Sequence, residues 1–172
     1  MQRLLRAQPV LLAVWPYLLL IIPRLPDPEA LSRFLWIYLP LTPVLYLLGV
    51  LRARQLRRQG DAAALSRLAL RIKLAQIPFY LGVFLLGLLT LLVMVVPAFV
   101  LVSPMLILFM AVCDWLLMAA SSWYALGAVR LLWNRGILST GQALAYTVCL
   151  FCFVLDVFAA LRLNRTVRSF PQ

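Results

Sequence analysis

Long uninterrupted runs of apolar residues, separated by short basic segments, make up most of this chain. Apolar runs of about 18 residues or more with few charges are typical of helices that cross a lipid bilayer. We therefore expect an all-α polytopic membrane protein. The pattern predicts a single transmembrane domain over residues 1–172. This domain is expected to be a bundle of about five transmembrane helices, at residues 7–22, 34–51, 77–100, 105–132 and 137–161. Four spans are the alternative, if the Pro-rich first segment only dips into the membrane.

The first of these runs follows two basic residues, Arg3 and Arg6. A basic start followed by an apolar run also describes a secretory signal peptide, but such a peptide ends in a small-residue cleavage site. The Pro-rich stretch at 23–28 contains no such site. The pattern therefore indicates a retained signal-anchor helix, short and bent at Pro16.

The segment at 52–73 is the one extended polar region of the chain. Within it, Gly60 and Asp61 form a helix stop followed by an N-cap. Leu65, Ala69 and Ile72 then recur on one face of a helix. This spacing predicts a short amphipathic helix that lies at the cytoplasmic headgroups and runs into the third span. The arginines expected at the membrane surface are Arg52, Arg54, Arg57, Arg58, Arg67 and Arg71.

Composition supports the membrane assignment and identifies the partner of the basic residues. Hydrophobic residues make up 65% of the 172 positions and charged residues only 12%, which leaves no room for a separate soluble domain. The net charge is +11, and the 16 basic residues flank the apolar runs. Their expected partners are the anionic headgroups of the lipid bilayer, and nucleic acid binding is not expected.

The basic residues also predict the orientation, because short cytoplasmic loops carry an excess of Lys and Arg. With five spans and a cytoplasmic N-terminus, eleven basic residues lie inside and five outside. Three of the outer five, Arg162, Arg165 and Arg168, lie close to the C-terminus and fit this arrangement poorly. Four spans with both ends inside would remove the discrepancy. The expected location is the cell membrane, and the signal-anchor start together with the excess of Arg over Lys favours a bacterial cytoplasmic membrane.

Two aspartates, Asp114 and Asp156, lie inside runs that are otherwise apolar enough to span a bilayer. An ionised group at the centre of such a helix costs about 2.5–3.5 kcal/mol on insertion scales, so it is a candidate functional group by default. Small and weakly polar residues follow the same helical faces, and such faces pack against one another in membranes. We expect both carboxyl groups to point inward. The candidate ligand-binding residues are Asp114, Asp156, Ser121, Thr90, Tyr80 and Trp115.

A purely structural role for the two aspartates is the alternative. A protonated Asp114 would donate one hydrogen bond to Thr90, a serine or a backbone carbonyl. Asp156 lies six residues before Arg162, about 9 Å along a helix, and would form a salt bridge with an arginine at the end of the span. Both interpretations stay open at the level of the sequence.

Most catalytic chemistry is not expected here. The chain has no histidine, so histidine-based acid–base catalysis and histidine-containing metal sites are excluded. Cys149 and Cys152 form a CxxC motif, but only Cys113 remains to relay electrons to it. Small apolar packing residues are the simpler interpretation of these cysteines. We expect no enzyme, no cofactor and no metal.

Three functional interpretations fit these residues. The first is a non-enzymatic membrane protein with a buried acidic site for a proton or a cationic small molecule, as a small transporter or its binding subunit. The second is an accessory or assembly subunit of a membrane complex, with structural aspartates. The third is a membrane thiol oxidoreductase. Because 172 residues barely enclose a pathway, a homo-oligomer or a larger membrane partner is expected.

Overall fold

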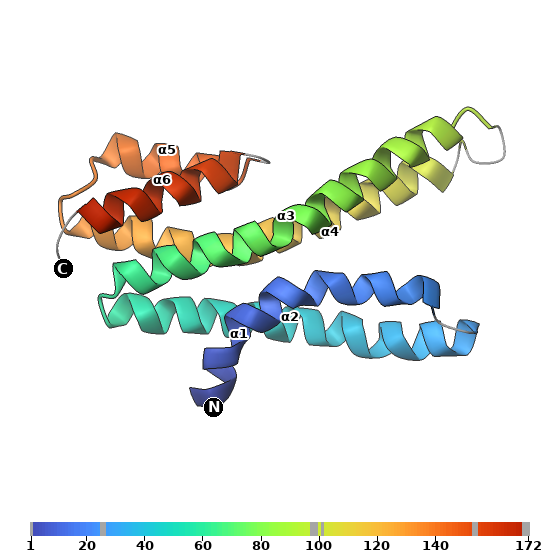
Figure 1. Cartoon of the computed structure of the whole chain (residues 1–172), viewed down its shortest axis with the longest axis horizontal. Helices are drawn as coiled ribbons and strands as arrows, with labels where there is room; N and C mark the ends of the chain where they lie inside the picture. The colour runs from blue at the N-terminus through green and yellow to red at the C-terminus, as the bar shows by residue number, and fades with distance from the viewer. Residues whose placement is uncertain (1, 25–26, 97–99, 101, 153–154, 170–172) are drawn as a thin grey trace.

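The computed structural model describes residues 2–24, 27–96, 100, 102–152 and 155–169, and the regular structure within these ranges is entirely helical (Figure 1). This confirms the expected all-α fold. The chain order is α1 (Gln2–Val14), the 3₁₀ helix η1 (Trp15–Arg24), α2 (Pro28–Arg58), α3 (Ala62–Val93), α4 (Val102–Asn134), α5 (Thr140–Cys149) and α6 (Leu155–Ser169).

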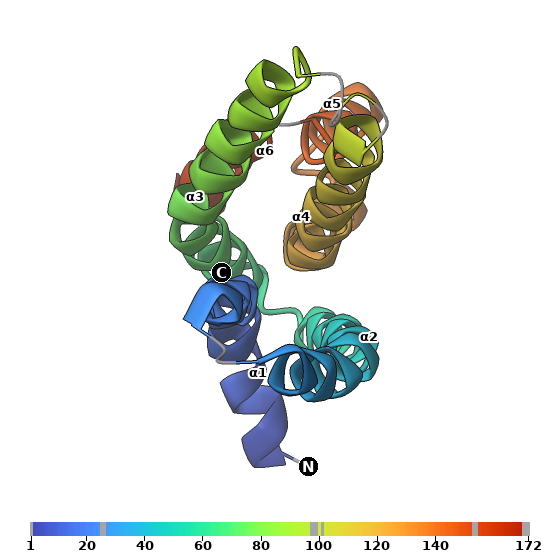
Figure 2. The same cartoon turned by 90° about the vertical axis from the view of Figure 1, so that its right-hand side faces the viewer.

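Three of the described helices are long and apolar enough to cross a membrane: α2, α3 and α4, with 31, 32 and 33 residues. At about 1.5 Å per residue each is roughly 45–50 Å long, which exceeds the ~30 Å of a hydrocarbon core. Consecutive members run antiparallel, and α1 with η1 lies beside α2 (Figures 1 and 2). The third expected span, 77–100, ends in the structure at Val93, and residues 97–99 lie outside the described ranges.

The first expected span changes its helix type next to the proline that predicted a bend. The α-helix ends at Val14, and η1 starts at Trp15, directly before Pro16. Proline has no N–H to donate and its ring crowds the preceding turn, so a regular helix is interrupted there. Two side chains hold η1 in place. Trp15 Nε1 donates to Thr42 Oγ1 at 2.9 Å, and the Tyr17 hydroxyl donates to the Ala75 carbonyl at 2.5 Å.

The stop and start between α2 and α3 lie where the sequence predicted them. Gly60 takes φ +74°, a left-handed conformation that favours glycine, and Asp61 caps α3 by accepting a hydrogen bond from the Ala64 N–H at 2.7 Å. The apolar face that contains Leu65 and Ile72 is buried. It belongs to the first half of α3, which packs against α4 and α6 within the bundle.

The fifth expected helix, over 137–161, is instead two short helices, α5 and α6, with 10 and 15 residues. A capping box at Ser139 starts α5, which ends at Cys149; α6 then returns along α3. Ser66 Oγ donates to Asn164 Oδ1 at 3.3 Å and joins the second half of α6 to the first half of α3. The α5–α6 hairpin therefore covers one half of the bundle only (Figure 1).

This hairpin gathers the arginines at one end of the molecule. We call this the basic end, and it contains the α2–α3 turn, the α4–α5 turn and the C-terminus of α6. Arg135 Nη2 connects the two turns by donating to the Gly60 carbonyl at 2.7 Å. Arg24 and Arg33 lie toward the opposite end. The three arginines of α6, which five full spans would have placed outside, therefore accompany the others. The arginines at or near the basic end are Arg52, Arg54, Arg57, Arg58, Arg67, Arg71, Arg130, Arg135, Arg162, Arg165 and Arg168.

Candidate functional site

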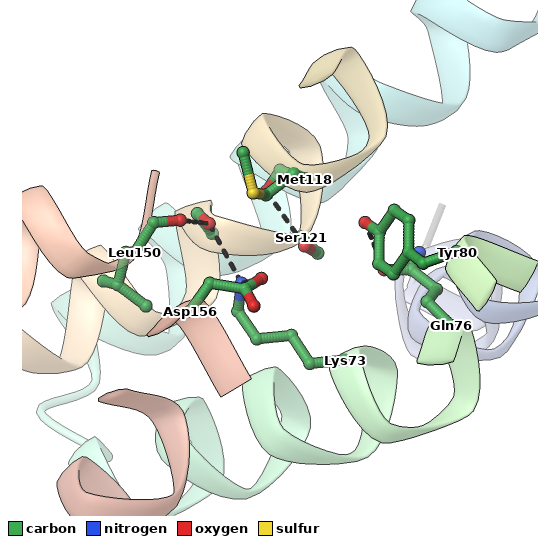
Figure 3. Close-up of polar contacts among 8 residues, drawn as sticks. Lys73, Gln76, Tyr80, Met118, Ser121, Leu150 and Asp156 are labelled. Atoms are coloured by element: carbon green, nitrogen blue, oxygen red, sulfur yellow. Dashed lines mark hydrogen bonds and ion pairs between the residues drawn. The ribbon is translucent and has the colours of Figure 1, made fainter. Parts of the chain in front are cut away.

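A buried ion pair joins α3 to α6 (Figure 3). Lys73 Nζ lies 2.5 Å from Asp156 Oδ2, and the two side chains are 0% and 5% exposed. The Lys73 ammonium also donates to Ser122 Oγ on α4 at 3.2 Å, and the Ser122 hydroxyl donates to the Leu150 carbonyl at 2.9 Å. Three helices and the segment after α5 are thus connected through one polar cluster.

The cluster neutralises the charge of Asp156. A buried carboxylate is tolerated where an opposite charge and hydrogen bonds replace its hydration. Asp156 also lies in the first turn of α6, where the helix dipole favours a negative charge. Its partner is Lys73 rather than the terminal arginine that the structural alternative suggested.

Lys73 was not recognised as a site residue from the sequence, where it closes the basic connector at 52–73. Two signals were present. It is the one lysine among 16 basic residues, and it lies four residues after Ala69, on the same face as the apolar residues of the amphipathic pattern. A charge on the buried face of a helix calls for a buried countercharge.

Tyr80 and Ser121, two of the expected site residues, meet between α3 and α4. Tyr80 is buried, its hydroxyl lies 3.5 Å from Gln76 Oε1, and it points toward Ser121 in Figure 3. The Ser121 hydroxyl donates to the Met118 carbonyl at 2.9 Å. Gln76 Nε2 donates to the Leu12 carbonyl at 3.2 Å and connects this pair to α1.

Gln8 forms another buried polar contact that the sequence did not reveal. Its Nε2 donates to the Leu45 carbonyl at 3.3 Å, and its Oε1 accepts from the Tyr124 hydroxyl. Gly49 allows this approach, because a Cβ at that position would lie 2.6 Å from Gln8 Nε2. The amide therefore holds α1 against α2 and α4.

Asp114 differs from Asp156 in having no ion-pair or hydrogen-bond partner among the described residues. The side chain is half-buried, and its Oδ1 is shielded from solvent without a hydrogen-bond partner among the described residues. No ion pair within the described ranges joins it to Lys73 or to another basic side chain. An unpaired carboxyl in such a position is expensive in a membrane and needs a donor, a cation or a proton.

The two remaining candidate ligand residues do not join Asp114. Thr90 Oγ1 donates to the Leu86 carbonyl of its own helix at 2.8 Å. Trp115 is 55% exposed and faces away from the bundle. The expected acidic site is thus divided into a buried Lys73–Asp156 pair and a separate, half-buried Asp114.

The comparison with family models identifies the group to which the chain belongs. A family of unknown function (DUF6652) matches residues 31–169. The chain is a member of this family. Neither the curated proteins nor the solved structures gave a match. The part matched by DUF6652 runs from α2 into α6 and contains Lys73, Asp114 and Asp156, whereas α1 and η1 precede it.

Within the DUF6652 region, the arginines expected at the membrane surface divide into three groups. Two of them bond to their own helix: Arg52 Nη1 donates to Gln55 Oε1 at 2.9 Å, and Arg67 Nε donates to the Ala63 carbonyl at 3.1 Å. Arg71 is exposed on α3. The other three, Arg54, Arg57 and Arg58, border a groove at the basic end.

The cysteines of the CxxC motif lie at the break between α5 and α6. Cys149 is the last residue of α5, and Cys152 follows it in the connecting turn. Both thiols are free, as is Cys113. Cys149 packs against the apolar core, in keeping with a packing role.

Proposed function

We propose that this chain is a non-enzymatic integral membrane protein that acts as an accessory or assembly subunit and binds a membrane partner through the distal hairpin. The distal hairpin is the part of α3 and α4 at residues 81–93 and 102–116, next to their connection. The observation that carries the proposal is Asp114 Oδ1 in this hairpin, which has no hydrogen-bond partner among the residues that the structure describes. The side chain is only half-buried, so a partner would reach the carboxyl group from its exposed side and supply a hydrogen-bond donor or positive charge there.

The distal hairpin has the packing expected of an incomplete bundle. Ser103 is its one buried residue, in contrast to the basic-end half of the same helices. The α5–α6 hairpin ends short of it, and α2 with η1 diverges from it (Figures 1 and 2). Lipid tails can cover apolar side chains, so exposure by itself needs no partner. A carboxyl group that lacks a hydrogen-bond donor in the membrane does need a partner.

Small residues on the same hairpin would allow a partner helix to approach closely. A Cβ built on Gly82 or on Gly87 would meet nothing within 4 Å. Glycine on an open helix face lets two backbones come together, and interhelical hydrogen bonds then add specificity. The occupant of this face is therefore a transmembrane helix, of a second copy or of a different subunit.

A proton or a small organic cation bound at Asp114 is the second candidate, and the same unpaired oxygen favours it. Asp156 would take no part, because Lys73 already neutralises it at 2.5 Å. Asp114 would then be the sole counter-charge for the ligand, with Tyr80 and Ser121 deeper in the bundle.

Crosslinking in native membranes separates these candidates. A photoreactive residue at Leu108, in the distal hairpin, should form a discrete adduct, and Asp114→Leu should abolish it. The same residue at Ile37, equally exposed on α2, serves as the matched control and should form no discrete adduct. The absence of an adduct at Leu108, or its persistence in Asp114→Leu, would contradict the assembly role. Stabilisation of the wild type by an organic cation, lost in Asp114→Asn, would instead support the ligand site.

The clustered arginines support an orientation in which the basic end faces the cytoplasm, as positively charged loops do. With the α5–α6 hairpin returning to the basic end, the C-terminus would lie on the cytoplasmic side. The N-terminus lies on the same half of the molecule, and a cytoplasmic N-terminus is part of the proposal (Figure 1).

A further inference from the structure

We propose that a groove at the basic end binds an anionic glycerophospholipid, with its phosphate among four arginines and an acyl chain along the apolar wall. The groove has a volume of about 800 Å³ and lies between α2, α4 and α5. Its arginines are Arg54, Arg57 and Arg58 of α2 and Arg130 of α4. This site is distinct from the Asp114 surface and does not depend on the function proposed for that surface.

The groove is built from three regular helical faces. On α2, the residues at 54, 57 and 58 have the i, i+3, i+4 spacing that places side chains together. On α4, Trp123, Gly127 and Arg130 follow the same periodicity, and on α5 Ala143 and Thr147 do so. Such a surface is part of the folded bundle and is more defined than a flexible basic loop.

No carboxylate among the described residues neutralises the four arginines. The two ion pairs among the described residues are Arg33–Glu29 and Lys73–Asp156, so none of the groove arginines contacts a carboxylate there. Arginine presents a planar fork of N–H donors that matches phosphate in a bidentate manner. The chemistry that complements this groove is therefore an anionic phosphate ester.

The groove has a charged end and an apolar wall, which match the headgroup and the acyl chain of a lipid molecule in one leaflet. Its charged residues lie toward the ends of α2 and α4, whereas Val50, Leu126 and Leu144 line it as well and provide an apolar surface. Trp123 and Trp133 also line the groove, and tryptophan is enriched at the headgroup level of membranes. Basic pockets between membrane helices are known to hold anionic headgroups. A soluble phosphate compound would leave the apolar wall uncovered.

Lipid exchange into the purified full-length protein tests this site. Native mass spectrometry would count the lipids retained from mixtures of phosphatidylglycerol and phosphatidylcholine, and nanodiscs of each lipid would report thermal stability. We expect wild type to retain phosphatidylglycerol preferentially. The double variant Arg57→Gln/Arg130→Gln should lose about 25-fold in affinity, since each basic residue near an anionic surface contributes about fivefold.

Two control variants separate the groove from the general positive charge of the basic end. Arg67→Gln/Arg71→Gln removes the same charge from the same end but from α3, outside the groove, and should retain the preference. Ala143→Phe fills the apolar wall without changing any charge and should weaken binding. Equal losses in both arginine pairs, or no preference for phosphatidylglycerol in wild type, would overturn the proposal. Displacement of the lipid by glycerol 3-phosphate would overturn the assignment to a lipid rather than to a free phosphate ester.

Discussion

Removing one partner of the Lys73–Asp156 ion pair should destabilise the protein strongly, whereas removing both should not. In Lys73→Met, the Asp156 carboxylate stays 5% exposed and loses a countercharge that lay 2.5 Å away. In Asp156→Leu, the Lys73 ammonium stays fully buried and keeps, within the described part of the chain, only the Ser122 hydroxyl as an acceptor. Breaking a buried pair in this way costs about 3–5 kcal/mol.

The double variant Lys73→Met/Asp156→Leu has no buried charge left to compensate. Replacing a buried ion pair by apolar residues of similar volume is often neutral or stabilising. The two single substitutions should therefore be strongly non-additive, with a coupling free energy of several kcal/mol, above the ~0.5–3 kcal/mol seen for most neighbouring residues. The sign of the coupling is the main point: the second substitution should restore stability that the first removed.

Reversible unfolding of the full-length protein in mixed micelles, followed by circular dichroism, would give the four free energies of this cycle. The exposed pair Arg33–Glu29, with an N–O distance of 2.9 Å and side chains 77% and 81% exposed, provides the control cycle. Its coupling should be small, because solvated ion pairs contribute little. Single variants at Lys73 and Asp156 that are no less stable than the double variant would refute the reasoning.

Two further predictions concern helix packing and topology. Gly49→Ala should lower the free energy of unfolding by about 1–3 kcal/mol, because its Cβ would displace Gln8 from its buried hydrogen bonds, whereas Gly87→Ala, in open space, should not. An equal effect at both glycines, in the same unfolding assay, would contradict this account. Cysteines introduced at Arg168 and at Arg33, in a chain without its native thiols, should react with a membrane-impermeant reagent from opposite sides. Labelling of both from the same side would rule out the returning α5–α6 hairpin.

The composition and periodicity of the sequence were sufficient to predict the all-α fold, helices apolar enough to cross a membrane, and the approximate bounds of α4, expected at 105–132 and observed at Val102–Asn134. Both α2 and α3 begin before their expected spans, at Pro28 and Ala62. These features depend on neighbouring residues. The turn at Gly60 and the cap at Asp61 need only a local conformation and one local hydrogen bond, and the buried face of α3 follows from spacing along one helix. Local signals of this kind can be recognised in a single sequence.

The candidate site was predicted only in part, because the sequence locates a buried charge but does not identify its partner. Asp156 was singled out as an unusual residue, and the structural alternative paired it with an arginine six positions away. The structure joins it to Lys73, 83 positions earlier in the chain. Asp114 was singled out by the same argument, and only the structure distinguishes it as the unpaired one of the two.

Hydropathy and spacing along the sequence thus determined which segments are helical, which are apolar and where charges are costly. The tertiary structure decided that the apolar run at 137–161 folds back as two helices, that the C-terminal arginines accompany the others at the basic end, and that three separate faces form one groove. The physical reason is the range of the interactions. An average over neighbouring residues contains no information on the ammonium of α3 that binds Asp156 at the start of α6, or on the α4 hydroxyl that binds the Leu150 carbonyl between α5 and α6.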